Sequence, residues 1–319
     1  MEKIRVAIAG LGAFGMKHFN GLKNIDGAEV TAFIVRDAST VKKLAEENNI
    51  KNVFENLDDA LASPEIDALI LSTPTALHAR QAIACLRAGK HVEVEIPMCD
   101  KLSEGEELAR LQEQTGLVAM AGHTRRFNPP HQYIHSLVEG GKLVIQQMDV
   151  QTYFFRRTNI NAEGKPRSWT DSLLWHHAAH TIDLFAYQTM GRVTASNALQ
   201  GPIDETLGIP LDMSILLQSS SGAVCTLSLS FNNDGPIGTN FRYIGDTGTW
   251  LTHYDDFYSG HDEKIDLTGF CVSSNGIELQ DREFIAAIME NREPNASVRQ
   301  VLPCYQVIDK LERELARQG

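Results

Sequence analysis

The chain has 319 residues, of which 43% are apolar, with 24 glycines and 11 prolines. This composition predicts a well-cored globular protein of two domains and excludes a disordered or fibrous chain. Its 41 acidic and 29 basic residues give a net charge of −12, which disfavours binding to nucleic acid and to anionic lipid.

The absence of targeting signals and the scattered cysteines favour a cytoplasmic protein. No apolar run reaches the roughly 18 residues of a transmembrane helix, and the first residues show no signal-peptide pattern. The cysteines have no CxxC spacing, so we expect neither a disulfide nor a structural zinc site. They are Cys85, Cys99, Cys225, Cys271 and Cys304.

The most informative stretch lies at the N-terminus. An apolar run over 4–9 leads into a Gly-Leu-Gly-Ala-Phe-Gly motif, and a helical pattern follows to about Ile25. In such a strand–turn–helix, the first glycine allows a tight turn, the second admits a pyrophosphate and the third lets helix and strand pack closely. Glycine-rich turns also occur for purely structural reasons, but this context favours a dinucleotide site. Its expected residues are Gly10, Gly12, Ala13, Phe14 and Gly15.

The second predicted strand, over 29–35, ends at Arg36-Asp37. About 20 residues after the glycines, an acid binds the adenosine ribose of NAD, whereas an arginine accommodates the 2′-phosphate of NADP. Arg36 comes first here, and the hydroxyls of Ser39 and Thr40 follow as possible phosphate donors. We therefore expect NADP, with NAD as the alternative.

Further alternating elements complete the first 122 residues. Strands are expected over 68–72, 91–95 and 117–121, with helices over 78–88 and 103–115. Gly89 is expected to end the first of these helices, and Ser103 with Glu106 to form a capping box for the second. Proline-containing turns end the first two strands, at the carboxyl edge where cofactors bind. Residues 1–122 should form a Rossmann domain with a doubly wound parallel sheet.

After residue 123 the pattern becomes rich in strands joined by turns, which indicates an antiparallel sheet. Strands are expected over 144–155, 194–199, 213–218, 223–231 and 239–245, and helices over 128–139, 171–190, 280–291 and 297–317. We predict that residues 123–319 form an α+β domain for substrate binding and oligomerisation, built on a large open sheet. The C-terminal helices are candidates to pack back on the first domain.

Taken together, these motifs resemble the Gfo/Idh/MocA oxidoreductase family over essentially the whole chain. The resemblance is carried by the glycine motif, by Thr73-Pro74-Thr75 with His78, by Glu95-Ile96-Pro97, by Arg126-Phe127-Asn128-Pro129 and by His180-Thr181-Ile182-Asp183. It implies a dinucleotide domain, an open antiparallel sheet whose exposed apolar face pairs subunits, and a homodimer. Further cofactor contacts are expected at Thr73, Pro74, His78, Glu95 and Pro97.

Longer runs at 122–129, 151–159 and 167–180 resemble the branch of the family that acts in protocatechuate 4,5-cleavage. This resemblance implies NADP-linked oxidation of the cyclic hemiacetal of 4-carboxy-2-hydroxymuconate-6-semialdehyde to 2-pyrone-4,6-dicarboxylate. Two departures from the family matter. The lysine of the family's E-K-P motif is Ile96, and the aspartate four residues before the family histidine is His176. A lysine-centred proton relay is therefore excluded.

Histidines offer a base in its place, because imidazole titrates nearest neutrality. His176 and His180 share one helix face, with Asp183 one turn further as a possible orienter, while His177 points about 100° away. We expect His180 to act as the general base and His176 to position the substrate hydroxyl, with His177 as a third candidate. A structural polar cluster is the other interpretation. A zinc site ranks low, since no third ligand is identifiable.

The implied substrate carries two carboxylates, which bidentate arginines bind well. Candidates are the pairs Arg125-Arg126 and Arg156-Arg157, of which Arg125, Arg126 and Arg156 are carried as site residues. Neighbours in an extended segment point to opposite faces, so at most one arginine of each pair should face the site. Tyr153 and Trp169 are candidates to flank a flat ring.

Three alternatives stay open. Cys99 offers a thiolate that would attack the open aldehyde, although no activating partner adjoins it. A second alternative is that the chain is a family member that acts on a sugar or cyclitol, which the missing lysine and the clustered arginines disfavour. A non-enzymatic dinucleotide-binding regulator is a third, and it leaves the histidine face unexplained.

Overall fold

Two units make up the chain, and each has its own sheet. The computed structural model describes residues 3–160, 164, 166, 170–253 and 256–317. The first unit comprises Met1–Thr124 with Asn275–Leu302, and the second comprises Arg125–Ser274 with Pro303–Gly319. None of the described helices combines the length and the apolar character that crossing a bilayer requires.

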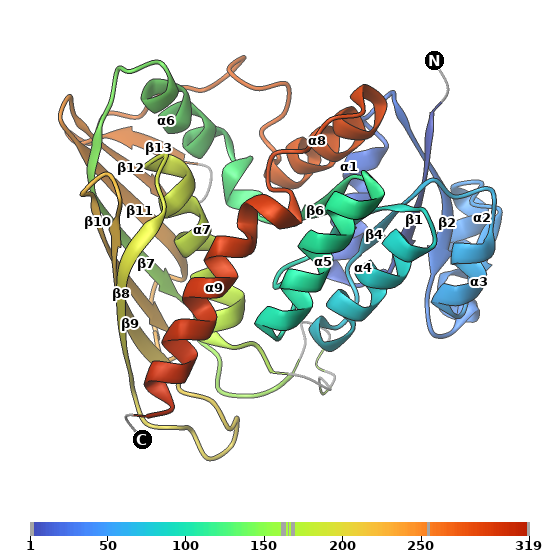
Figure 1. Ribbon diagram of the computed structural model, residues 1–319, viewed down its shortest axis with the longest axis horizontal. Coiled ribbons are helices and arrows are strands. Elements are labelled where there is room, and N and C mark those ends of the chain that lie inside the picture. Colours follow the sequence, from blue (N-terminus) through green and yellow to red (C-terminus); the bar gives the residue numbers. More distant parts are fainter. Residues whose placement is uncertain (1–2, 161–163, 165, 167–169, 254–255, 318–319) are drawn as a thin grey trace. The chain divides into compact units, whose positions relative to one another are not determined.

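The first unit contains six parallel strands in the order β3-β2-β1-β4-β5-β6 (Figure 1). Their bounds are β1 Ile4–Ala9, β2 Ala28–Ile34, β3 Asn52–Phe54, β4 Ala68–Leu71, β5 His91–Val94 and β6 Ala119–Ala121. The central strand β4 is buried along its whole length, as expected where helices cover both faces of a parallel sheet. The strand order reverses between β1 and β4, which is the switch point where such sheets bind ligands. The predicted doubly wound sheet is confirmed.

Helices connect these strands. They are α1 Ala13–Leu22, α2 Lys42–Glu47, α3 Leu57–Ala62, α4 His78–Arg87, α5 Leu102–Thr115 and α8 Gly276–Glu290, with the 3₁₀ turns η1 Ala38–Val41 and η2 Thr75–Leu77. Gly89 follows α4 with φ +74°, as predicted for a glycine that ends a helix. The predicted capping box is wrong. The extended residue before α5 is Lys101, so the helix has already begun at Ser103.

The second unit contains seven strands in the order β13-β12-β11-β7-β10-β9-β8. Their bounds are β7 Ile145–Tyr153, β8 Val193–Gln200, β9 Asp212–Ser219, β10 Val224–Ser230, β11 Gly238–Gly245, β12 Thr249–His253 and β13 Asp256–Ser259. Only β7 and β10 pair in parallel, so the prediction of a mostly antiparallel sheet is confirmed. Strands β12 and β13 were not predicted, because Thr249–His253 shows no strict alternation of polar and apolar residues.

Helical segments lie on one face of this sheet (Figure 1). They are α6 Pro129–Glu139, η4 Leu173–Ala178, α7 Ala179–Gln188 and the part of α9 (Val298–Leu315) that follows Pro303. The alternation in β9 shows the two faces: Met213 is buried, whereas Leu216 is 57% exposed. Leu216 shares its face with the hydrogen-bonded pair Thr226 and Asp149. The free face is thus mixed in polarity, which corrects the expectation of an apolar face.

A buried ion pair fixes the start of the second unit to α7. Arg126 donates from Nε and Nη2 to the two carboxylate oxygens of Asp183, at 2.8 and 2.6 Å, and both side chains are almost fully buried. Burial opposes the charge of Arg126, but Asp183 outweighs it and raises the pKa of the guanidinium. Arg125 and Arg126 belong to the 3₁₀ turn Thr124–Arg126, not to the extended segment expected from the sequence.

Breaking this pair should destabilise the protein strongly. Asp183→Asn leaves the Arg126 cation buried without its counter-charge, so we expect a loss of about 3–5 kcal/mol in the free energy of unfolding. Urea unfolding followed by circular dichroism measures this loss. The control is Glu107→Gln, which removes a solvent-exposed pair with Arg110 and should cost less than about 1 kcal/mol. Equal effects of the two substitutions would contradict the assignment.

Candidate active site

Three glycines shape the turn between β1 and α1, and the steric reason differs among them. Gly10 has φ +84°, and a Cβ there would lie 2.6 Å from the carbonyl oxygen of Ser72. A Cβ on Gly15 would lie 1.9 Å from the carbonyl oxygen of Gly10. By contrast, apart from the chain neighbours of Gly12 and the backbone of its own helix, no described atom lies within 4 Å of the position that a Cβ of Gly12 would take. Packing therefore requires Gly10 and Gly15, whereas Gly12 borders open space.

Gly12 is also the N-cap residue of α1, so this open space lies at a helix N-terminus. No side chain caps the helix, and its first turn contains no acidic residue. The first amides of a helix lack intrahelical partners and form the positive end of its dipole. Of the predicted contacts, Ala13 and Phe14 lie in this first turn and are exposed. The arrangement fits the pyrophosphate of a dinucleotide at the switch point of the sheet.

The end of β2 presents an exposed arginine. No residue in the described part of the chain forms a hydrogen bond or ion pair with Arg36. The hydroxyl of Ser39 donates to the carboxylate of Asp37 at 2.6 Å, and the hydroxyl of Thr40 donates to the Asp37 carbonyl at 2.7 Å. The two hydroxyls are thus used locally, whereas the side chain of Arg36 is exposed.

His78 holds together the loops that follow β4 and β5. Nε2 of its buried ring lies 2.7 Å from the carbonyl oxygen of Thr73, and Nδ1 lies 2.9 Å from the carbonyl oxygen of Pro97. Both partners are backbone carbonyl oxygens, so the ring bridges the two loops through its two nitrogens. Thr73 is further fixed through its hydroxyl, which donates to Gln81. His78 therefore supports the loops, and Pro74 lies on the segment that it holds.

Glu95, directly after β5, contacts a residue that the sequence analysis did not single out. Its Oε1 lies 2.9 Å from Nε2 of His18, and its Oε2 accepts a hydrogen bond from the amide of Ile96. His18 is completely buried in α1. The sequence signal that could have singled out His18 is its position three residues after Gly15, on the same face of the helix.

In the second unit, the histidines lie on a π-helical segment that continues into an α-helix. His176 and His177 belong to η4, and His180 is the second residue of α7. Single π-helical turns occur often at functional sites. Nδ1 of His176 accepts a hydrogen bond from the amide of Ser172 at 3.0 Å. The proton of neutral His176 therefore lies on Nε2, which makes this histidine a hydrogen-bond donor rather than a base.

His177 lies between aromatic rings. Its ring centroid is 5.3 Å from that of Phe154 and 5.2 Å from that of Phe231, and its Nε2 has no hydrogen-bond partner among the described residues. Burial, together with the neighbouring His176 and the guanidinium groups of Arg156 and Arg125, lowers the pKa of His177 to about 3. This imidazole is neutral, and its interaction with both arginines indicates that they face the same region of the second unit.

The structure distinguishes the members of each arginine pair. Arg125 is half-buried and lies 3.5 Å from the hydroxyl of Thr239, while the carboxylate of Asp183 already holds Arg126. Arg156 is mostly buried and forms an ion pair with Asp171, whereas Arg157 is exposed. Arg125 and Arg156 are therefore the members of the two pairs that interact with the histidine segment.

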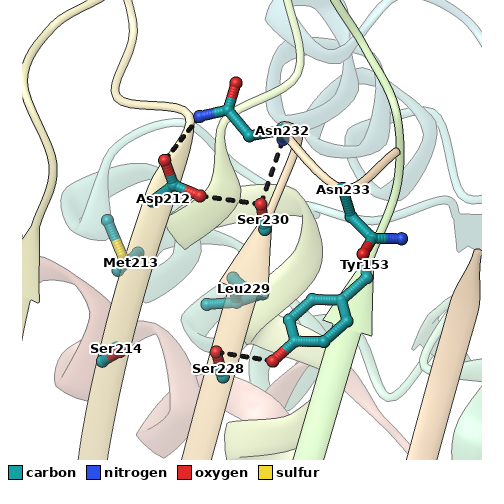
Figure 2. A pocket seen from close by; sticks show the side chains of 9 residues that line it. All are labelled: Tyr153, Asp212, Met213, Ser214, Ser228, Leu229, Ser230, Asn232 and Asn233. Atoms are coloured by element: carbon teal, nitrogen blue, oxygen red, sulfur yellow. Dashed lines mark hydrogen bonds between the residues drawn. The ribbon is translucent and has the colours of Figure 1, made fainter. Parts of the chain in front are cut away.

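Tyr153 lies apart from this group. Tyr153 is one of the residues that line a hollow of about 390 Å³, and its hydroxyl donates to the hydroxyl of Ser228 at 3.0 Å. Figure 2 shows this bond between the neighbouring strands. Tyr153 and its neighbour Phe154, which contacts His177, point to opposite faces of the sheet, as successive strand residues do. Tyr153, a candidate to flank a flat ring, therefore lies on the face of the sheet away from His177, and its role stays a prediction. Trp169 lies outside the described residues.

The alternative nucleophile, Cys99, is buried next to acidic residues. Burial, together with the negative charges of Glu104 and Asp100, raises the pKa of its thiol to about 12. The thiolate that would attack an aldehyde is therefore not formed at neutral pH. This environment agrees with a structural role for the cysteine.

Comparison with known proteins identifies the family. Residues 4–123 match the family model "Oxidoreductase family, NAD-binding Rossmann fold", and residues 129–271 match "Bacterial oxidoreductases, C-terminal". The chain is 60% identical over 316 residues to 4-carboxy-2-hydroxymuconate-6-semialdehyde dehydrogenase of a Sphingobium species, covering 99% of this chain and 100% of that one. The chain belongs to the Gfo/Idh/MocA family. It is an NAD(P)-dependent oxidoreductase of this family, with a Rossmann domain and an open sheet domain.

More distant relatives include inositol 2-dehydrogenase 2 of Mycolicibacterium vanbaalenii, which is 33% identical over 45% of this chain and 42% of that one. Among solved structures, levoglucosan dehydrogenase in complex with NADH and L-sorbose has a TM-score of 0.87 at 18% identity, covering 100% of this chain and 98% of that one. The WlbA dehydrogenase from Bordetella pertussis, in complex with NADH and UDP-GlcNAcA, has a TM-score of 0.84 at 19% identity, with 100% and 97% coverage. At such identity the likeness to both structures shows the fold.

Substitutions at two glycines of the turn should affect cofactor binding and folding differently. Gly12→Ala adds a methyl group only to the open space, so we expect stability to change by less than about 1 kcal/mol while the Kd for the dinucleotide rises at least about tenfold. Gly15→Ala drives a Cβ into the Gly10 carbonyl and should cost about 2 kcal/mol or more. Calorimetric titration and thermal unfolding measure the two effects. Unchanged binding by Gly12→Ala would contradict the site.

Proposed function

We propose that this oxidoreductase uses NADP to oxidise the cyclic hemiacetal form of 4-carboxy-2-hydroxymuconate-6-semialdehyde to 2-pyrone-4,6-dicarboxylate. The observation that carries the proposal is the 60% identity, over 99% of the chain, to a dehydrogenase named for this semialdehyde. The reaction places the chain in the protocatechuate 4,5-cleavage route. The relative's name gives the substrate, and the hemiacetal form and the product are part of the proposal.

The residues of the second unit suit this chemistry. Oxidation of the hemiacetal removes a proton from the hydroxyl and a hydride from its carbon, and bound nicotinamide supplies the hydride acceptor. In our proposal His180 takes the proton, and the Nε2–H of His176 donates a hydrogen bond that orients the hydroxyl. Ile96 replaces the lysine that serves other family members. A hemiacetal hydroxyl is more acidic than that of a simple alcohol, so imidazole suffices as the base.

The two carboxylates of the proposed substrate call for cations in the same region. Arg125 and Arg156 meet this requirement, because both act on His177 electrostatically. An anionic substrate would offset their charges and shield the buried imidazole from them. Arg126 is left out of this role, because its side chain is almost fully buried and Asp183 accepts from both its Nε and its Nη2. Arg156 also has a carboxylate partner, Asp171, but its side chain is more exposed than that of Arg126.

For the cofactor we propose NADP rather than NAD. Arg36 is exposed at the end of β2, and no described carboxylate neutralises it, so it is available to a 2′-phosphate.

For the assembly we propose a homodimer. The exposed Leu199, Leu216 and Val224 on the free face of the second sheet are its candidate contact residues.

The reaction is tested by following nicotinamide reduction with the semialdehyde and either NADP or NAD. Wild-type protein should reduce NADP and form the pyrone dicarboxylate. His180→Asn should lower kcat/KM by roughly 10²–10⁴-fold, as expected for loss of a general base, while leaving the Kd for NADP within about threefold.

The control is His261→Asn, which alters an exposed histidine and should keep full activity. Tight dinucleotide binding without reduction of either cofactor would refute the dehydrogenase proposal and favour a regulator. Reduction that persists in His180→Asn would refute only the assignment of the base.

Cofactor preference is tested at Arg36. Because hydrogen bonds to charged groups contribute about 1.5–3 kcal/mol, Arg36→Ala should raise the Kd for NADP by about tenfold or more. The Kd for NAD should change by less than about threefold. Arg87→Ala, in the last turn of α4, is the control and should leave both constants unchanged. Equal losses for NADP and NAD on Arg36→Ala would contradict a phosphate-binding role.

A further inference from the structure

Four ionisable side chains meet in the interior of the first unit. His18 lies on α1, Asp281 on α8 and Glu93 on β5, and Glu95 is the residue that directly follows β5. The exposed fractions of His18, Glu93 and Asp281 are 0%, 1% and 0%. A charge in such surroundings persists only when it is paired, so the protonation of the group can be inferred from its contacts.

His18 lies between two carboxylates. Its Nδ1 is 2.7 Å from Oδ1 of Asp281, and its Nε2 is 2.9 Å from Oε1 of Glu95. Ionised carboxylates can only accept hydrogen bonds, so both contacts together require a proton on each ring nitrogen. Burial opposes this charge, but the neighbouring carboxylates outweigh it and raise the pKa of His18, Asp281 most of all. His18 is therefore an imidazolium.

Glu93 keeps its proton at neutral pH. Burial raises its pKa to about 8, and the charge of Asp281 contributes in the same direction. One of its oxygens accepts a hydrogen bond from Nε2 of Gln280 at 2.6 Å, and the other has no partner among the described residues. The imidazolium thus faces two carboxylates, Asp281 and Glu95, rather than three.

The geometry favours protons over a metal ion at this position. Ligand atoms of His18, Glu93 and Asp281 all lie within 4.8 Å of one another, which would suit a cation. However, two ligands of one tetrahedral zinc lie about 3.3 Å apart when each bond is about 2.0 Å. The 2.7 Å between His18 Nδ1 and Asp281 Oδ1 is instead a hydrogen-bond distance.

Close packing leaves this arrangement little freedom. A Cβ on Gly21 of α1 would lie only 3.0 Å from Oδ2 of Asp281, so α1 and α8 are in direct contact. Glu278 is the other acid that faces Asp281, and Arg282 pairs with it. His18 is therefore held in place from α8, and its second ring nitrogen reaches Glu95, where β5 ends at the carboxyl edge of the sheet.

We propose that His18 is a positioning residue of the dinucleotide site: held by Asp281 through Nδ1, its ring fixes the Glu95 carboxylate through Nε2. The inference rests on the proposed dinucleotide binding at the glycine turn and at Glu95. Ionisation of Glu93 adds a third carboxylate that competes for the same cation and repels an anionic cofactor. The affinity for the dinucleotide should then depend on the protonation of Glu93, even though the dinucleotide does not contact Glu93.

The test is the Kd for NADP and for NAD, measured by calorimetric titration between pH 6.5 and 9.5. Affinity of the wild-type protein should fall about tenfold as the pH rises through about 8, where Glu93 ionises. Glu93→Gln is the matched variant, because its amide stays neutral and still accepts from Gln280. It should bind as the wild type does at pH 7 and keep that affinity at pH 9. His18→Gln should weaken binding about tenfold or more at every pH.

Thermal unfolding gives a second readout with a defined sign. Glu93 has an ordinary pKa of 4.5 in the unfolded chain and about 8 in the folded one, so the folded state holds the extra proton between these values. Rising pH through this window therefore favours unfolding of the wild type. Relative to the wild type, Glu93→Gln should gain stability from pH 5 to pH 8. This comparison stands even if His18→Gln does not fold.

The outcomes separate the proposals. Identical pH profiles for the wild type and Glu93→Gln would overturn the positioning role, as would stoichiometric metal in the purified protein that is lost in Asp281→Asn. A wild-type protein that binds neither dinucleotide at any pH would instead refute the proposed function. A pH-dependent wild type with a flat Glu93→Gln profile would support the inference.

Discussion

Backbone contact at the glycine turn is the constraint on which the first unit depends. A Cβ on Gly15 would lie 1.9 Å from the carbonyl oxygen of Gly10, and a Cβ on Gly10 would lie 2.6 Å from the carbonyl oxygen of Ser72. With hydrogen atoms alone at these positions, α1 lies directly against the ends of β1 and β4. The same contact sets the direction of α1, so it places the uncapped N-terminus beside Gly12 and buries His18 one turn further along.

Both units bury charge and compensate it in different ways. The second unit places Arg126 and Asp183 in a bidentate pair, where every charge has an opposite partner. The buried cluster of the first unit has three carboxyl groups, from Glu93, Glu95 and Asp281, for the one imidazole of His18. A proton on Glu93 reduces this imbalance. Buried pairs of this kind contribute little net stability compared with apolar packing, but removal of one partner is costly. Their arrangement therefore favours one geometry over others more than it stabilises the fold.

The second unit combines groups that a lysine-based dehydrogenase does not need. His177 and His176 lie on η4, and both histidines and the arginines Arg125 and Arg156 are electrostatically coupled. His177 is neutral, and neutral His176 carries its proton on Nε2. Burial and, after it, the nearby cations hold the pKa of His177 low, and an anion bound beside the cations would reverse their part of the effect. Electrostatic coupling of this kind would allow an anionic substrate to change the basicity of its own site.

By itself, the sequence determined the parts of the protein that depend on local patterns. The glycine motif, the buried parallel strands and the alternating strands of the second half predicted both sheets, because periodicity and turn residues are read within a few positions. The motifs also identified the family, since Thr73, Glu95 and His180 stand at matching places along the chain. The pairing of β7 with β10, by contrast, joins strands separated by more than 70 residues and left no local signal.

Only the tertiary structure decided which side chains act together. It separated Tyr153 from His177 by placing them on opposite faces of one sheet, paired Arg126 with Asp183, and engaged the hydroxyls of Ser39 and Thr40 locally. It also brought Asp281 to His18 across 263 positions of sequence. Contacts at such separations depend on packing between elements, and burial then sets the pKa of each group. A sequence specifies both, but no short pattern within it displays them.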